Sequence, residues 1–455
     1  MKTPTARTLA LAAVPLCFGC GNLAMRALLQ FAPAHLQADL AQPLPVATAW
    51  GGYGSAAFAI LASTILLAAV ATVVAIRAAT PAEKAADDSM RIGFAALASL
   101  ALALAWPVAF SSDVYAYAAY GELALRGLDP YVRVAPNVHG ALIDAARWQW
   151  GGSFPPCLYG TAFVAIARGL VVAYGSHGSA ATLFAFRACA ALAWLAAGYV
   201  FRLLASGLPA RFRGPAVTAF ALNPLALWCA AEGHNDALMM LLVLGGTLAA
   251  TRGAVFAGGV AIGLSPFIKA AGAAAGPLLA IYLGATAGPR RALLLAGGYM
   301  GALALATAFV LPRLGPALAA LRLHGVYVPQ FSLQGLVGLR PALAASALLA
   351  LAGVRLLATG RAGGSVCIAA ALWLALPNPY PWYALWIVPV AAGFLGWGGW
   401  ALWAATIAGG IRYLPDAYGE MGNANAMLLV LIALMPFAIA AAFRPGLRAS
   451  EGALP

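Results

Sequence analysis

The sequence predicts an all-α membrane protein: one polytopic bundle of about 12 to 14 transmembrane helices that takes in the whole of residues 1–455. The first observation behind this prediction is the composition. Hydrophobic residues make up 63% of the chain and charged residues 9%, whereas a soluble domain carries about 25% charged residues. The second observation is that the apolar residues gather in runs, several of which approach the ~20 residues that cross a bilayer. A water-soluble fold is therefore excluded.

Taken in order, the apolar runs locate the expected helices. In the first half they lie at 8–30, 55–76, 92–110, 156–175, 180–201, 215–231 and 237–250. In the second half they lie at 254–268, 270–286, 292–311, 341–358, 365–376, 383–396, 398–411 and 424–443. The first run is too long for the apolar core of a secretory signal, so it is interpreted as a retained helix. Several runs are shorter than a full crossing, so one run does not always equal one span.

The basic residues predict the orientation, because Lys and Arg accumulate on cytoplasmic loops. Lys2 and Arg7 place the N-terminus in the cytoplasm, and Arg444 and Arg448 place the C-terminus there too. When the sides are assigned from each end of the chain in turn, the loops before and after run 156–175 are both placed on the outer side of the membrane. A single crossing between them is inconsistent with that result. Either that run is re-entrant or half-buried, or one basic loop breaks the rule.

Net charge and cysteines exclude other classes of function. The formal charge of +13 is explained by basic cytoplasmic loops, so nucleic acid is not an expected partner. Cys17 and Cys20 have the spacing of a redox motif, but they lie within the first apolar run. Packing is the expected role of thiols in that setting, ahead of a disulfide or a metal site.

The stretch SSDVYAYAAYGELALRGLDPY, residues 111–131, follows the third apolar run and carries acid–base and sugar-binding residue types. These residues are Asp113, Tyr115, Tyr117, Tyr120, Glu122 and Asp129. If the stretch is helical, Asp113, Tyr117 and Tyr120 share one face, and Pro130 ends the helix. An ionisable group at a membrane edge is by default a functional hypothesis, and Asp113 is the candidate general base. The alternative is a solvated loop with interfacial tyrosines.

A second polar cluster lies between two apolar runs, where Glu232 and Gly233 precede His234, Asn235 and Asp236. Because unpaired polar groups in hydrocarbon are costly, the cluster needs a wet setting, and its donors and acceptors suit sugar hydroxyls or a phosphate. The spacing of His234 and Asp236 does not favour a metal.

Two further groups extend the candidate site. Lys269 ends the apolar stretch SPFIK, where it either binds an anionic phosphate or extends its ammonium group toward water. Trp382 and Tyr383 follow two helix-breaking prolines in NPYPWY, and Arg412 comes later in the chain. These aromatic residues are either part of a binding site or members of an interfacial belt.

The four motifs SSDVYAYAAYGELALRGLDPY, NPLALWCAAEGHNDALMM, SPFIKAAG and NPYPWYALW, in this order within residues 92–396, resemble those of GT-C-type glycosyltransferases. In particular, the chain is similar to the polyprenol-phosphate-mannose-dependent α-(1→6)-mannosyltransferases of bacterial envelopes. The resemblance implies a GT-C-like bundle with a substrate-binding outer loop in the bacterial inner membrane. It also implies inverting transfer of mannose from a polyprenyl-phosphate donor to a glycan or lipid acceptor on the outer side, with Asp113 as base.

The residues fit this chemistry without a cofactor. A sugar hydroxyl is a weak nucleophile that gains from a carboxylate base, and a phosphate leaving group gains from cations, for which Lys269 and Arg412 are candidates. No Gly-rich nucleotide loop is present in the sequence. The rival class is a secondary transporter or a flippase for lipid-linked sugars. Transporters place ionisable residues near the midplane between internal repeats, and no clear repeat is seen here.

Overall fold

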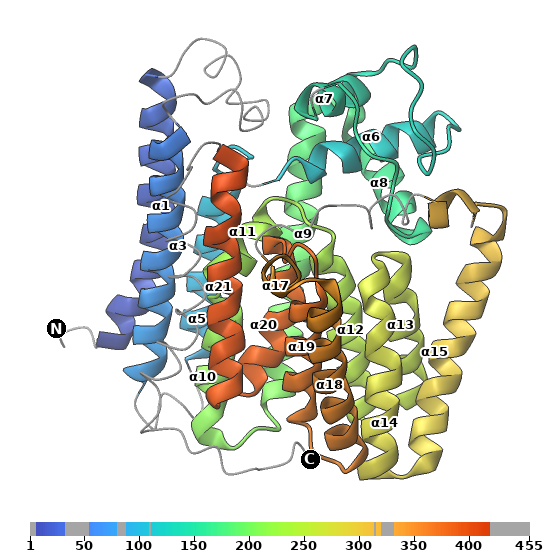
Figure 1. The fold of residues 1–455 in the computed structure, drawn as a ribbon. Helices are drawn as coiled ribbons and strands as arrows, with labels where there is room; N and C mark the ends of the chain where they lie inside the picture. Colours follow the sequence, from blue (N-terminus) through green and yellow to red (C-terminus); the bar gives the residue numbers. More distant parts are fainter. Residues whose placement is uncertain are drawn as a thin grey trace.

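The computed structural model describes residues 6–31, 54–79, 88–108, 111–150, 152–313, 315–319 and 332–418. All regular structure within these ranges is helical, which confirms the all-α class. Most of the helices run roughly parallel to one another, so that they form a bundle with two ends (Figure 1). The expected helix at 424–443 lies outside the described residues.

Six described helices are long and apolar enough to cross a membrane. They are α1 (Ala6–Phe31), α3 (Gly54–Arg77), α9 (Ser179–Ala205), α14 (Ala275–Ala287) with the preceding η5 (Ala270–Ala274), α15 (Pro289–Val310) and α18 (Leu339–Ala358). A seventh crossing arises if the bent pair α10 (Ala210–Ala221) and α11 (Pro224–Ala231) is one span. The chain is thus a polytopic helical bundle. The predicted count of about 12 to 14 crossings is not reached by these helices alone and stays a prediction.

The bend between α10 and α11, 42° in size, has a local cause. Pro224 begins α11 and has no backbone N–H to continue the ladder of α10. The side chain of Asn223 caps the new helix by accepting a hydrogen bond from the Ala226 N–H at 2.9 Å, and its amide donates to Thr406 Oγ1 at 3.1 Å. Thr406 belongs to α21 (Trp397–Tyr418), so the bend is tied to the C-terminal helix.

Three pairs of helices meet at irregular tips. Residues 232–235 join α11 to α12 (Asp236–Thr251). The 3₁₀ turns η4 (Ser265–Phe267) and η5 lie between α13 (Val255–Leu264) and α14. Residues 376–383, which include η7 (Pro381–Tyr383), lie between α19 (Gly364–Ala375) and α20 (Ala384–Gly393). Irregular backbone at membrane depth is tolerated where protein or water surrounds it. The tips are therefore the places in the bundle suited to polar side chains.

Three helices form a cap at one end of the bundle: α6 (Asp113–Leu125), α7 (Ala141–Gln149) and α8 (Thr161–Tyr174), the last followed by η3 (Gly175–His177) (Figure 1). Gly121 of α6 has no room for a β-carbon, because that atom would lie 2.5 Å from the carbonyl oxygen of Ala167 in α8. Helix α8, the helical part of run 156–175, therefore packs alongside α6, and its 14 residues are not among the candidate membrane spans. This favours the interpretation in which the run stays on the side of the Asp113 loop.

The remaining elements complete the bundle. Helix α5 (Ser89–Leu104) leads to the cap, and its end is followed by Trp106, whose indole donates to the Phe18 carbonyl of α1 at 3.0 Å. The short η6 (Leu311–Arg313) follows α15, and α17 (Leu333–Val337) precedes α18. Trp106 and Trp228 pack edge to face with their ring centroids 4.6 Å apart, so α1, α5 and α11 share one aromatic core.

Candidate active site

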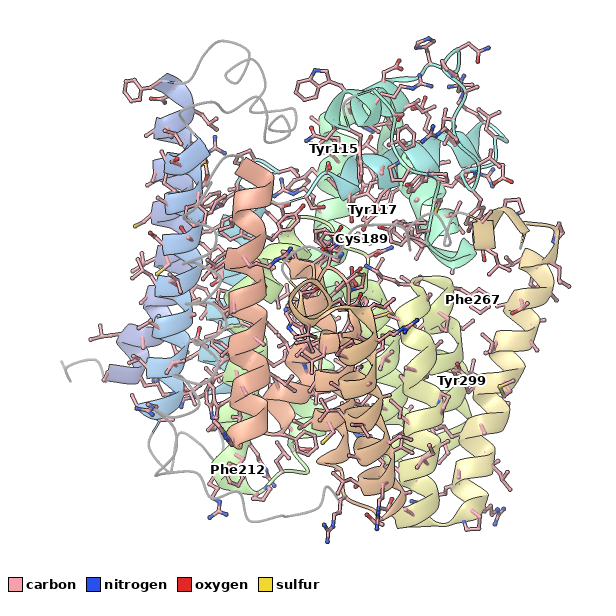
Figure 2. The ribbon with its side chains drawn as sticks, viewed as in Figure 1. Tyr115, Tyr117, Cys189, Phe212, Phe267 and Tyr299 are labelled. Atoms are coloured by element: carbon pink, nitrogen blue, oxygen red, sulfur yellow. The ribbon has the colours of Figure 1, made fainter. Side chains whose placement is uncertain are left out.

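Asp113 is the first residue of α6, at the point where the cap meets the bundle. Its Oδ2 accepts long hydrogen bonds from the hydroxyls of Tyr117 and Tyr159, each at 3.4 Å. The two hydroxyls also contact each other at 3.3 Å. Figure 2 shows Tyr117 between the cap and the helices below it. The predicted helix is present, although α6 ends at Leu125, before Pro130. Of the predicted face, Tyr117 contacts Asp113, whereas the Tyr120 hydroxyl donates to the Pro155 carbonyl at 2.8 Å.

The setting of the Asp113 carboxylate raises its pKa to about 6. Burial is the largest cause, because it disfavours the charged form. The positive charge of Lys269 acts in the opposite direction, while the negative charge of Asp236 raises the pKa further. The cap lies outside the candidate membrane spans. A carboxylate with a pKa just below neutrality is ionised at pH 7 and still basic enough to take a proton.

The tip between α11 and α12 brings His234 to the same carboxylate. Its Nδ1 lies 3.8 Å from Asp113 Oδ2, beyond direct hydrogen-bond distance. The side chains of His234 and Asn235 are both buried, at 1% exposure each, and neither has a hydrogen-bond partner among the described residues. Buried polar groups without partners are rare, so this tip has donors and acceptors to offer a ligand.

Lys269 and Asp236 form a buried ion pair beside this tip. The Lys269 ammonium lies 2.8 Å from both carboxylate oxygens of Asp236, and the indole of Trp386 donates to Asp236 Oδ1 at 2.5 Å. Aromatic rings enclose the ammonium group: its nitrogen lies 5.6 Å from the ring centroid of Tyr159 and 5.3 Å from that of Tyr383. Such contacts stabilise a partly desolvated cation.

The tip between α19 and α20, together with the first turn of α20, supplies a group of stacked aromatic rings. This aromatic wall consists of Tyr380, Trp382, Tyr383 and Trp386. Trp382 stacks on His234 with centroids 4.5 Å apart and ring planes 15° apart. On its other side Tyr380 stacks on Trp382 at 4.7 Å, and Tyr383 stacks on Trp386 at 4.3 Å. Stacked aromatic rings of this kind are broad apolar surfaces with polar edges. The wall joins the Asp113 side of the site to the Lys269 side.

The structure therefore brings together most of the predicted site residues from separate parts of the chain. They are Asp113, Tyr117, His234, Asp236, Lys269, Trp382 and Tyr383. Asn235 is buried in the same tip.

The other predicted residues have other surroundings. Glu122 accepts the backbone N–H groups of Leu142 and Ile143 at 3.0 and 3.1 Å, so it caps α7. Asp129 accepts the backbone N–H of Tyr131 at 2.9 Å in the loop after α6.

Two further predicted residues are buried in helices. Tyr115 is buried in α6. Arg412 is buried in α21 next to Tyr413, whose ring packs on Trp382.

Two residues of the site were missed by sequence reasoning. Tyr159 stands alone between the cap helices, in a segment where nothing marks it as a partner of Asp113. Trp386 lies on the first turn of α20, three residues after Tyr383. Its spacing from Tyr383 on a helix was the available signal.

Among the residues that the structure describes, no group of three or more His, Cys, Asp or Glu side chains is placed to hold a metal ion. The arrangement offers instead a carboxylate base, a cation, hydrogen-bonding groups without partners and an aromatic wall. Together these suit a reaction in which an acceptor hydroxyl loses a proton while a negatively charged group leaves a donor sugar.

The fold and this site define a polytopic helical membrane protein in which charged, polar and aromatic side chains gather where a three-helix cap meets the bundle. Residues 16–285, more than half of the chain, match the family model described as alpha-(1->6)-mannopyranosyltransferase, N-terminal domain. The chain belongs to this alpha-(1->6)-mannopyranosyltransferase family, as its motifs predicted.

Two relatives agree with this assignment. The chain is 34% identical over 180 residues to alpha-(1->6)-mannopyranosyltransferase A of Mycobacterium tuberculosis, a match that covers 39% of this chain and 34% of the relative. It is 31% identical over 156 residues to a protein of Mycolicibacterium smegmatis named probable alpha-(1->6)-mannopyranosyltransferase, covering 32% of this chain and 26% of that relative. The matched region thus spans about a third or less of these relatives. No solved structure matches the chain.

Proposed function

We propose that this protein is an integral-membrane mannosyltransferase that transfers mannose from a polyprenyl-phosphate donor to a glycan or lipid acceptor of the cell envelope. The family and the membrane fold support the class of reaction. The observation that carries the proposal is the convergence of Asp113, at the start of α6, with His234 and the Lys269–Asp236 pair at the tips of the bundle helices. A donor held by its lipid in the bilayer can present its phosphate at these tips, with no need for a nucleotide-binding fold.

The reaction proceeds by inversion in one displacement. The acceptor hydroxyl oxygen forms a bond to the anomeric carbon of mannose, and the bond from that carbon to the phosphate oxygen breaks. Asp113 takes the hydroxyl proton, and polyprenyl phosphate leaves with the bonding electron pair. A base of this kind contributes about 10²–10⁴-fold to the rate. Tyr117 and Tyr159 keep the Asp113 carboxylate oriented by their hydrogen bonds.

The phosphate is assigned to Lys269. Asp236 uses part of the hydrogen-bonding capacity of the ammonium group, which has three donors, and so leaves a donor for a phosphate oxygen. Asp236 also fixes the position of the cation, so that little rearrangement is needed when charge develops on the leaving group. Arg412 is the second candidate cation, at the α21 side of the aromatic wall.

The direct test is transfer by purified protein in lipid vesicles supplied with a panel of polyprenyl-phosphate sugars and envelope glycan acceptors. We expect transfer from the mannose donor, and a loss of about 10²–10⁴-fold in Asp113→Asn with donor binding retained. Near-normal transfer by Asp113→Asn would reassign the base. Movement of a solute or lipid-linked sugar across the vesicle, with no transfer to the acceptor, would favour the transporter class.

A further inference from the structure

Glu232 is a buried carboxylate that the reaction above does not use. It caps the end of α11, two residues before His234, and its side chain is 2% exposed. Its Oε2 accepts the backbone N–H of Ser111 at 2.8 Å, and its Oε1 accepts the indole N–H of Trp228 at 3.2 Å. A buried carboxylate is costly unless its charge and lone pairs are satisfied, so these contacts need an explanation.

Ser111 connects Glu232 to the start of α6. The Ser111 hydroxyl accepts the backbone N–H of Asp113 at 3.2 Å. Ser112 occupies the position that normally caps a helix, but its side chain makes no capping hydrogen bond. The first turn of α6 is therefore held from outside the helix, by Ser111 and, through Ser111, by Glu232.

Arg187 of α9 anchors the other side of the same junction. Its guanidinium donates to the carbonyl of Ala231 at 2.7 Å and to that of Ala103 at 3.2 Å. These carbonyls belong to the end of α11 and to α5, the two helices on either side of the Glu232–Ser111 contact. The charges of Arg187 and Glu232 interact, so the buried carboxylate has a compensating cation.

Gly233 allows the close approach that this contact requires. Its φ of +92° is a conformation that favours glycine. A β-carbon there would lie 3.0 Å from the side chain of Val114 in α6. The tip between α11 and α12 thus touches α6 through Gly233 and binds it through Glu232.

From this geometry we infer that Glu232 is a positioning residue, which acts through Ser111 to hold Asp113 at the correct distance from the His234 tip. The inference rests on the proposed role of Asp113 as base. A single tip then supplies both the polar side chains of the site and the bond that sets the cap over them. A misplacement of about 1 Å in a reacting group can lower the rate by about 10²-fold.

Two substitutions of Glu232 distinguish the effect of its side-chain length from the effect of its charge. Glu232→Asp keeps the charge but withdraws the carboxylate from Ser111 by about 1.5 Å, one carbon–carbon bond. Glu232→Gln loses the charge but keeps an oxygen at the length needed to accept the Ser111 N–H. We expect Glu232→Asp to lower kcat by about 10²-fold with donor KM close to that of the unmodified protein. We expect Glu232→Gln to keep most of kcat. Trp228→Phe removes the indole donor to Glu232 and leaves the Ser111 bond in place, so it serves as the control for disturbed packing.

The pH profile distinguishes positioning from loss of folded protein. In Glu232→Asp we expect water to reach the loosened start of α6 and lower the pKa of Asp113. The acidic limb, which is the fall of kcat/KM at low pH, then moves from about pH 6 toward the ordinary aspartate value of ~3.9. In Glu232→Gln the limb stays near its original pH. Equal losses in the two variants, or near-normal kcat with an unmoved limb in Glu232→Asp, would overturn the inference.

Amide hydrogen exchange provides a test that does not depend on transfer activity. Segment 111–125 is expected to exchange faster in Glu232→Asp than in Glu232→Gln, whether or not the mannose donor is the true substrate. Unchanged exchange would refute the positioning role, whereas failure of the unmodified protein to transfer mannose would refute only the proposed function. If Glu232→Asp does not fold, Ser111→Pro, which removes the donor N–H, is compared with Ser111→Ala, which keeps it. Both variants lose the hydroxyl that accepts the Asp113 N–H, so their difference reports the bond to Glu232. Faster exchange of 112–125 in the proline variant than in the alanine variant supports the inference, and equal exchange refutes it.

Discussion

At the scale of single residues, the proposed reaction depends on the ionisation of Asp113. Only the ionised carboxylate accepts a proton, and its pKa is about 6 because burial outweighs the attraction of Lys269. Transfer activity should therefore fall as the pH drops through about 6 and level off above it. The measurement is kcat/KM for transfer between about pH 4.5 and 8. An acidic limb near 4 would mean that Asp113 is hydrated, or that another group is the base.

Removing the Lys269 charge should move this limb to higher pH, because that charge lowers the pKa of Asp113. Lys269→Met also leaves Asp236 buried without its cation, which costs about 3–5 kcal/mol when one partner of a buried pair is removed. Thermal unfolding of the variant is measured beside its pH profile, and apparent donor affinity should weaken. Arg168→Met, which removes an exposed cation from α8, is the matched control and should leave the limb in place. A limb that does not move, with unchanged donor affinity, would show that Lys269 serves packing alone.

Residue types were easier to predict than residue partners. Asp113, His234, Asp236 and Lys269 stand out because charged and polar groups are rare in this chain. The aromatic partner Tyr159 was missed, because a lone tyrosine in an apolar protein carries no signal until the fold brings it to a carboxylate. Glu122 has the composition of a site residue, yet its carboxylate caps α7.

At the scale of elements, apolar runs predicted most helices but did not predict where a run stops partway through the bundle. Runs 237–250, 254–268 and 365–376 correspond to α12, α13 and α19. Hydropathy reports that a segment is apolar, but it does not report whether its end lies at the membrane surface or at an internal tip. The tips place polar residues inside the bundle, and their positions depend on close packing of the helices that flank them.

The packing of α13 against α15 is one such contact, and it has no room for added side chains. A β-carbon at Gly298 of α15 would collide with the backbone carbonyl of Phe256 in α13. Gly298→Ala should separate the two helices and displace η4 and η5, which flank Lys269, so both thermal stability and transfer should fall. The adjacent Gly297 has open space around it, and Gly297→Ala should be tolerated. Small residues allow this close approach of helices in membranes. Equal behaviour of the two variants would mean that the α13–α15 contact is adjustable.

At the scale of the whole molecule, the cap explains why the count of basic loops was inconsistent. Helix α8 is 14 residues long and packs beside α6, so the chain returns to the bundle from the side on which it left. With run 156–175 removed from the list of crossings, the orientations counted from the two ends agree. The cap and the three tips then lie toward one side, and the basic turn between α14 and α15 lies at the opposite end (Figure 1).

This arrangement predicts opposite labelling of the two ends in intact cells. We expect the cap to face outside, because the loop that contains Arg290 and Arg291 is basic and belongs in the cytoplasm. In a variant lacking the native cysteines, His139→Cys on the exposed cap loop should react with a membrane-impermeant thiol reagent. Arg290→Cys should react only after the membrane is opened, and that second reaction also shows that the position is accessible. Labelling of position 290 alone in intact cells would reverse the orientation. The mannosyl donor would then have to present its sugar on the cytoplasmic side, and the proposed envelope acceptor on the outer side would be excluded.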